Sequence, residues 1–260
     1  MAEVPVARLS VDERVAAILA EVQRSGFASI TALSESLAVS DMTIRRDIRK
    51  LASEGELRVV HGGVSLPHGT LRTATFAGRA EHESDAKRTI AQAALDLVSP
   101  DDTIALDSGT TCYAVAAGLD HEFRGCVVTH SVPILQQMLD FPQATVIGLG
   151  GELLAESQVL IGGSTTAAAQ ALAIDTFFLG ANSVDSRGVY LRGSRERPVK
   201  TALMESAARV VLLVDGTKLT HTAPVRLCQL DGLSTLITTG PVPDDVRRAC
   251  GKADVEILLT

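Results

Sequence analysis

The segment from Val39 to Leu51 constrains the fold more than any other part of the chain. Its apolar residues Ile44, Ile48 and Leu51 recur at the i, i+4, i+7 spacing of one helix face, which predicts a helix with a buried stripe. Ser40 precedes the stripe and has the hydroxyl typical of a helix N-cap. The other faces of this helix carry hydroxyl, guanidinium and ammonium groups, from Thr43, Arg45, Arg46, Arg49 and Lys50.

The surroundings of this helix are those of a helix-turn-helix. Residues 30–38 predict a short upstream helix, and residues 38–40 predict the tight turn that joins two crossed helices. A helix over residues 12–24 completes a small core, and residues 56–64 predict a two-stranded wing that turns on a glycine pair. Arginine binds guanine edges in the major groove, and both arginine and lysine neutralise phosphates. This context favours duplex DNA as a partner over an ordinary solvated basic face.

The charge of the whole chain gives little sign of such a partner. The net charge is −7 and the sequence pI is about 5.4, whereas DNA-binding domains are usually basic. Residues 1–65 hold 8 Lys+Arg against 9 Asp+Glu, but residues 42–50 hold four cations and one anion. The positive field is therefore local, and we expect modest DNA binding by one copy and stronger binding by a dimer.

The segment from Arg14 to Val64 is similar to the winged helix-turn-helix of the DeoR family of bacterial transcriptional regulators. The similarity rests on Val39, Ser40, Thr43, Ile44, Arg45, Arg46, Asp47, Leu51, Gly55, Leu57, His61, Gly62 and Gly63. It implies that Thr43 and the two following arginines reach DNA, whereas Asp47 orients an arginine. The residues expected to contact DNA, from the helix and from the wing, are Ser40, Thr43, Arg45, Arg46, Arg49, Lys50, Arg58 and His61.

The remainder of the chain predicts a second domain of a different class. The pattern weakens over residues 66–84, which we interpret as a linker between a DNA-binding domain (1–65) and an effector and oligomerisation domain (85–260). Helices are expected at 87–98, 110–118, 132–139, 164–172 and 199–208. Short apolar strands are expected at 103–107, 126–129, 144–149, 176–179, 210–214, 235–238 and 255–258. This alternation is typical of an α/β domain built on a largely parallel sheet.

Polar and glycine-rich clusters follow five of these strands. They are residues 107–111, 129–131, 148–152, 180–182 and 215–218. Ligands of such sheets bind beyond the carboxyl ends of the strands, and a helix that begins there favours an anion. A single cluster is weak evidence, because turns alone use these residue types. Five at one edge, with a lysine among them, predict a phosphate-bearing polyhydroxy ligand.

This second half also resembles the DeoR-family effector domain, whose fold is akin to ribose-5-phosphate isomerase, sugar-phosphate deaminases and CoA transferases. The resemblance implies a sugar-phosphate sensor in which residues 108–111 hold the phosphate and Lys218 adds charge. The chain departs from the family by His130 in place of Asn and by Thr239 in place of an acidic residue. The expected effector-binding residues are Asp107, Ser108, Gly109, Thr110, Thr111, His130, Gly150, Gly151, Asn182, Glu196, Lys200 and Lys218.

His130 leaves two interpretations open. Beside the ligand it would change which sugar fits, or make ligand release depend on pH near the usual histidine pKa of roughly 6.5. Alternatively, its ring simply donates a hydrogen bond to a loop carbonyl.

The isomerase kinship raises the question of catalysis. Glu196 could serve as the carboxylate base that aldose–ketose isomerisation needs, or it could form an exposed i, i+4 ion pair with Lys200. We favour the ion pair, since Asn182 stands where the related isomerases carry an acidic residue and an amide cannot exchange a proton with substrate. The sequence therefore predicts a binding site without enzymatic activity.

Cysteine usage and hydropathy indicate the compartment. Cys112, Cys126, Cys228 and Cys250 are scattered, without the paired spacing of a zinc site, so reduced thiols and no metal or cofactor are expected. The sequence shows neither a signal peptide nor a long apolar run, which favours a cytoplasmic protein without a membrane contact.

Together these features predict a transcriptional regulator, with a repressor of carbohydrate metabolism as the leading hypothesis. Its partners would be double-stranded operator DNA, a phosphorylated sugar, and further copies of the chain in a homodimer or homotetramer. Two alternatives remain. One is a sugar-phosphate isomerase or deaminase with a DNA-binding appendage. The other is a module that assembles with other proteins through its acidic half.

Overall fold

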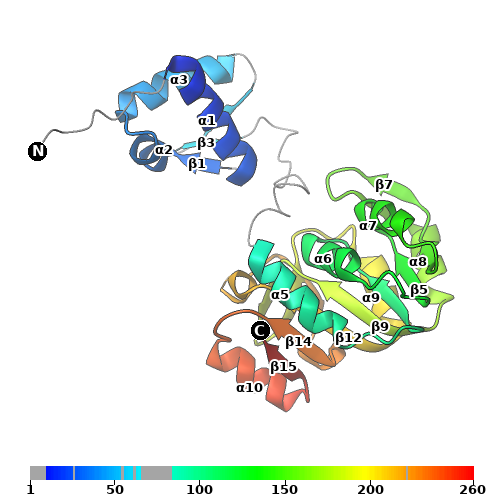
Figure 1. The fold of residues 1–260 in the computed structure, drawn as a ribbon. Coiled ribbons are helices and arrows are strands. Elements are labelled where there is room, and N and C mark those ends of the chain that lie inside the picture. Colours follow the sequence, from blue (N-terminus) through cyan, green and yellow to red (C-terminus); the bar gives the residue numbers. More distant parts are fainter. Residues whose placement is uncertain (1–9, 26, 54–55, 61–62, 66–83, 221) are drawn as a thin grey trace, which may run out of the picture. The chain divides into compact units, whose positions relative to one another are not determined.

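The computed structural model describes residues 10–25, 27–53, 56–60, 63–65, 84–220 and 222–260. The chain divides into two compact units, residues 1–81 and residues 82–260 (Figure 1). The predicted linker at 66–84 lies outside the described residues except for its last position, Ser84, which begins a helix.

The first unit is a winged helix-turn-helix, as predicted. Its helices are α1 (Val11–Ser25), α2 (Ile30–Ser36) and α3 (Asp41–Ser53). Its strands are β1 (Phe27–Ser29), β2 (Arg58–Val60) and β3 (Gly63–Ser65). The strands pair antiparallel in the order β1-β3-β2. The predicted two-stranded wing therefore has a third strand, β1. This strand was not predicted, because three residues are too few to show a strand pattern.

A compact apolar core holds the three helices together. Ile18 and Val22 of α1 pack with Ile44, Ile48 and Leu51 of α3, and all five side chains are buried. The Ser40 hydroxyl accepts a hydrogen bond from the Thr43 backbone N–H at 3.3 Å, which is the predicted N-cap. Ala38 takes a left-handed backbone conformation with φ of 51° and reverses the chain between α2 and α3.

The second unit is built on a wholly parallel seven-stranded sheet with the strand order β15-β14-β12-β9-β4-β5-β6. These strands are β4 (Thr103–Leu106), β5 (Cys126–Thr129), β6 (Thr145–Gly148), β9 (Ile174–Gly180), β12 (Ala207–Val214), β14 (Thr235–Thr238) and β15 (Glu256–Leu259). All seven predicted strands are confirmed, six of them within two residues at each boundary, while β12 begins three residues before the predicted start at 210.

Helices cover both faces of this sheet (Figure 1). They are α5 (Ser84–Leu95), α6 (Thr110–Gly118), α7 (Val132–Gln137), α8 (Gly163–Gln170), α9 (Arg197–Glu205) and α10 (Asp244–Lys252). Single-turn 3-10 helices are η1 (Met138–Asp140), η2 (Gly216–Leu219) and η3 (Leu230–Gly232). One core joins α5, α6 and α7 to the sheet, and the other joins α8, α9 and α10 to the opposite face. Buried strand residues such as Phe177 and Phe178 alternate between the two cores.

Two antiparallel additions and one helix were not predicted. The additions are the hairpin of β7 (Glu152–Leu154) with β8 (Val159–Ile161), and a small sheet of β10 (Ser183–Asp185), β11 (Gly188–Leu191) and β13 (Val225–Cys228). The missed helix is α10. The four cysteines are free thiols. Across the described part of the chain, no helix has both the length and the apolar character to span a membrane.

Candidate DNA-binding and effector sites

Helix α3 has two opposite faces. Ile44, Asp47, Ile48 and Leu51 are buried against the rest of the first unit. The four cations Arg45, Arg46, Arg49 and Lys50 are exposed. The helix therefore presents a contiguous cationic surface to solvent, which matches the arrangement that phosphate and base contacts require.

Asp47 interacts with a neighbouring helix rather than with solvent. Its Oδ2 accepts a hydrogen bond from Nε of Arg14 on α1 at 2.6 Å, and both side chains are buried. The resemblance implied that Asp47 orients an arginine, and the arginine it holds comes from α1 rather than from the exposed face of α3. This ion pair fixes how α3 sits on α1.

The remaining predicted DNA contacts differ in how they are placed. Thr43 is half-buried, and its hydroxyl lies 3.0 Å from the Ser40 hydroxyl, with which it shares a hydrogen bond. His61 and the side chain of Arg58 lie outside the described residues. The cations of α3 are thus the predicted contacts that the structure presents most openly.

The effector unit brings its five polar clusters to one edge of the sheet. Strands β12, β9, β4, β5 and β6 are consecutive neighbours and run parallel, so the loops at their carboxyl ends are adjacent. The spacing of these loops along the chain exceeds a hundred residues from first to last, yet the fold collects them.

A buried ionic cluster lies at the centre of this edge. Asp107, at the end of β4, accepts a hydrogen bond from the Gly180 backbone N–H at 2.9 Å and is paired with the Lys200 ammonium of α9. Lys200 Nζ also lies 3.7 Å from Glu196 Oε2, and the Ser108 hydroxyl donates to Glu196 Oε2 at 2.9 Å. Four predicted effector residues therefore form one connected network.

The expected exposed pair of Glu196 and Lys200 is wrong in one respect. The pair exists, but Lys200 is only 3% exposed because α9 packs on the sheet and turns this residue inward to Asp107. Burial alone would lower the pKa of Lys200, yet the carboxylates of Asp107 and Glu196 raise it above its usual value. Burial would likewise raise the pKa of Glu196, but Lys200 and hydrogen-bonding hydroxyls hold it below its usual value. Both groups are therefore charged at neutral pH.

His130 lies behind this cluster. Its ring is fully buried, and Nε2 is 3.7 Å from Asp107 Oδ1. Burial lowers the pKa of His130, and the Asp107 carboxylate opposes this only in part, so the ring is neutral near pH 7. Among the described residues, neither ring nitrogen has a hydrogen-bond partner, nor do Asp107 Oδ1 and the Ser131 hydroxyl. A bond from the ring to a loop carbonyl, one of the two interpretations, is not formed.

The glycines and hydroxyls of the edge shape the backbone around the cluster. Gly109 is the N-cap residue of α6 and has φ of 143°. Because glycine has no side chain, the cap offers no hydrogen-bond acceptor to the backbone N–H groups at the start of this helix, near Thr110 and Thr111. Gly150 O accepts the Thr165 hydroxyl. Gly151 has φ of 134°, and a Cβ there would lie 2.4 Å from Ile161 O, so no larger residue fits.

The predicted residues Asn182 and Lys218, and Thr239, also have polar partners in the effector unit. Asn182 Oδ1 accepts the Arg192 backbone N–H at 2.8 Å, which ties β10 to the segment before α9. Lys218 Nζ lies 3.7 Å from the Asp215 carboxylate. Thr239, the second departure from the family, accepts the Gly216 N–H at 3.4 Å.

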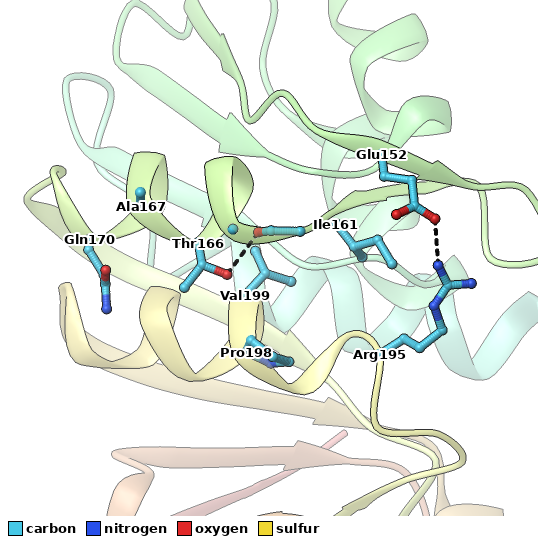
Figure 2. A pocket seen from close by; sticks show the side chains of 10 residues that line it. Glu152, Ile161, Thr166, Ala167, Gln170, Arg195, Pro198 and Val199 are labelled. Atoms are coloured by element: carbon cyan, nitrogen blue, oxygen red, sulfur yellow. Dashed lines mark hydrogen bonds and ion pairs between the residues drawn. The ribbon is translucent and has the colours of Figure 1, made fainter.

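A pocket of about 490 Å³ opens between α8 and α9. It is lined by Glu152, Ile161, Gly162, Gly163, Thr166, Ala167, Gln170, Arg195, Pro198 and Val199. Figure 2 shows the Glu152–Arg195 ion pair, 2.6 Å long, at one end and Gln170 at the other. The sequence analysis did not predict this pocket. The glycine pair Gly162–Gly163 at the start of α8 was the one sequence feature that could have indicated it, and no sequence pattern singles out Arg195.

Comparisons with known proteins agree with this division into units. The DeoR-like helix-turn-helix domain matches residues 14–70, and the DeoR C terminal sensor domain matches residues 82–239. The chain belongs to the DeoR family. This confirms the resemblance on which the sequence interpretation rested, and with it a DNA-binding transcriptional regulator.

Relatives in this family match almost from end to end. An uncharacterized HTH-type transcriptional regulator, YgbI, of Escherichia coli is 32% identical over 95% of this chain and 97% of that protein. The L-fucose operon activator of Haemophilus influenzae is 29% identical over 93% and 97%. The glycerol-3-phosphate regulon repressor of Escherichia coli is 28% identical over 93% and 96%. Among solved structures, ribose 5-phosphate isomerase A of Methanocaldococcus jannaschii is 18% identical, with a TM-score of 0.39 over 52% of this chain and 54% of that one.

Proposed function

We propose that this regulator represses a carbohydrate operon by binding operator DNA and is released by a phosphorylated sugar. The observation that carries the DNA-binding half is the division of α3, with Asp47 and three apolar side chains buried and four cations exposed on the opposite side. The names of its relatives include a glycerol-3-phosphate regulon repressor and an aga operon repressor, which support the carbohydrate assignment.

The sensor half of the proposal assigns the two ends of the ligand to different groups. The start of α6 at Gly109–Thr111 would bind the phosphate through backbone N–H groups, since a helix N-terminus favours an anion. Asp107, Glu196 and Lys200 carry one net negative charge between them and would bind hydroxyl groups instead. The neighbouring pocket of about 490 Å³ lies within the roughly 300–1,000 Å³ typical of small-molecule sites.

Release requires that the sugar prefers the conformation that binds DNA poorly, because only differential affinity shifts a population. A homodimer or homotetramer would present paired α3 helices to two half-sites on one face of the duplex. Such a protein acts where the operator is, in the cytoplasm.

We infer that the sensor site binds its ligand without converting it. A general base for isomerisation works best with a pKa near the operating pH, whereas Lys200 and hydroxyl donors lower the pKa of Glu196. The Asn182 amide oxygen accepts the Arg192 backbone N–H, and an amide does not act as an acid or a base near neutral pH. Incubation with ribose 5-phosphate should give no ketose above background, and turnover that Glu196→Gln abolishes would contradict this inference.

The proposal is tested by thermal shift against sugar phosphates, each beside its unphosphorylated parent. A ligand at about 100 times its Kd adds ~2.7 kcal/mol of stability. Both tyrosines, Tyr113 and Tyr190, lie in the effector unit and the chain has no tryptophan, so intrinsic fluorescence reports this unit alone. One phosphorylated sugar should raise the midpoint while its parent does not, and the same sugar should release duplex DNA. Stabilisation by the parent alone would contradict the phosphate assignment.

A further inference from the structure

Helix α3 exposes one large apolar side chain among its cations. Met42, in the first turn, is 78% exposed. Its position places it with Arg45, Arg46 and Arg49 at the i, i+3, i+4, i+7 spacing of one helix face. All four residues of this face are exposed, whereas residues 44, 47, 48 and 51 on the opposite face are buried. Met42 therefore belongs to the exposed cationic face of α3 and not to the core.

The first turn of a recognition helix is the part that reaches base edges in the major groove. Of the side chains in this turn, Thr43 is half-buried and its hydroxyl is shared with Ser40. Met42 is not held by a hydrogen bond to another described residue, and its flexible thioether side chain extends into solvent. The apolar feature that base edges offer in the major groove is the C5-methyl group of thymine.

We propose that Met42 is a specificity-determining residue that contacts the C5-methyl group of a thymine in the operator. The inference rests on the proposed binding of duplex DNA through α3 and adds to it the identity of one base. Arginines of the same face supply phosphate contacts and guanine recognition, and Met42 supplies the apolar contact that selects thymine beside them.

The test replaces thymine by uracil, which removes only the methyl group. A duplex enriched from a randomised library by the full-length protein is resynthesised with uracil at one thymine at a time, and each version is titrated by fluorescence anisotropy. Wild-type affinity should fall about fourfold at one thymine in each half-site, the loss expected when one methyl-sized group leaves an apolar contact. Met42→Ala should bind the parent duplex correspondingly weaker and show no further loss with uracil at that position.

Matched variants separate the methyl contact from other effects. Met42→Leu keeps an apolar side chain and should keep the uracil sensitivity, whereas Met42→Gln has similar length with a polar end and should lose it. Methionine, leucine, glutamine and alanine all favour helix, so α3 is retained in each variant. Leu139→Ala removes a side chain of similar exposure from the effector unit and should change nothing.

The possible failures are distinguishable. If wild-type protein is indifferent to uracil at every thymine, or if Met42→Ala keeps the full uracil sensitivity, the methyl contact is overturned while DNA binding through α3 stands. A Met42→Ala loss that is equal on thymine and uracil duplexes points to a contact between protein copies and also overturns it. If the library yields no enriched duplex, the proposed function itself fails.

Discussion

The two units place their functional groups in contrasting ways. In the first unit, four cations lie within residues 45–50 on the exposed face of a single helix. In the effector unit, Asp107 and Lys200 are 93 positions apart and meet only in the buried interior. A surface on one helix is created by periodicity alone, whereas a cluster between strands exists only once the whole sheet has formed.

Each unit nevertheless has a buried ion pair among its described residues, and these two pairs differ in their surroundings. Arg14 and Asp47 join two helices of a small core. Lys200 and Asp107 lie beside His130 and Ser131, whose buried polar atoms have no hydrogen-bond partner among the described residues. Buried polar groups without partners destabilise a fold unless a ligand or water satisfies them. The first pair therefore has a structural role, whereas the second lies in the site where we propose that the ligand binds.

The largest expected effect comes from Lys200→Met. This change leaves the Asp107 carboxylate buried without its cation, and breaking a buried pair in this way lowers the free energy of unfolding by about 3–5 kcal/mol. Urea titration followed by tyrosine fluorescence measures it, because both tyrosines lie in the effector unit.

The double variant Asp107→Asn with Lys200→Met serves as the control for that prediction. Removing both charges avoids the uncompensated carboxylate and should restore part of the lost stability. A cost below about 1 kcal/mol for Lys200→Met, the range typical of exposed pairs, would mean that the cluster is solvated and that the contrast between the units is wrong.

Asp47→Asn should act on the other unit. The loss of the ion pair with Arg14 is expected to destabilise the helix-turn-helix by about 3 kcal/mol, at the low end for a buried pair because the long arginine stem can carry its charge toward water. Far-ultraviolet circular dichroism should show an earlier loss of helix, while the tyrosine transition stays in place. A shift of both transitions would mean that the two units unfold together.

The difference between the units also explains what the sequence could predict. Helix α3, its N-cap at Ser40 and its buried stripe follow from local spacing, and the structure confirms them. The seven parallel strands were also predicted, because each is a short apolar run, although the helix α10 between the last two was missed. The three-residue strands β7, β8 and β10 escaped prediction, since so few residues show no period and depend on their partners for stability.

The contacts of the effector site were the least predictable part. Glu196 and Lys200 are four residues apart at a helix start, a pattern that most often denotes an exposed pair. Whether Lys200 faces solvent or Asp107 depends on how α9 is rotated against the sheet, and that rotation is set by Val199, Ala202 and Leu203 in the core. Local spacing contains no information on a partner 93 positions away.

A smaller effect is expected at the exposed face of α3. Arg45→Ala or Arg46→Ala should weaken operator binding by about 1–3 kcal/mol and relax specificity at one base, if the arginine contacts a guanine. Lys50→Ala should weaken binding evenly across duplexes and reduce the salt dependence by about one phosphate contact. Arg248→Ala, at an exposed arginine of α10, is the matched control. Unchanged affinity in both arginine variants at moderate salt would remove α3 from the DNA interface.

The smallest expected effect is the contribution of His130 to the pH dependence of folding stability. Measuring it tests whether the His130 ring is buried and neutral in solution. Because the pKa of His130 is lowered in the folded state, the unfolded chain takes up a proton first as the pH falls below roughly 6.5, and folding stability then declines. The decline reaches at most about 1.4 kcal/mol per pH unit, whereas above that pH both states are neutral and His130 contributes no pH dependence.

His130→Asn isolates this effect, since Asp107, Glu196 and Lys200 remain in place around the site. The stability difference between wild type and variant should be constant from pH 8 to about 7 and should shift against wild type by about 1 kcal/mol at pH 5.5. Tyrosine fluorescence in urea at each pH measures it. A difference that moves in favour of wild type at low pH would show that Asp107 pairs with a protonated His130, in which case the effector site contains a second cation and would bind an anionic group directly.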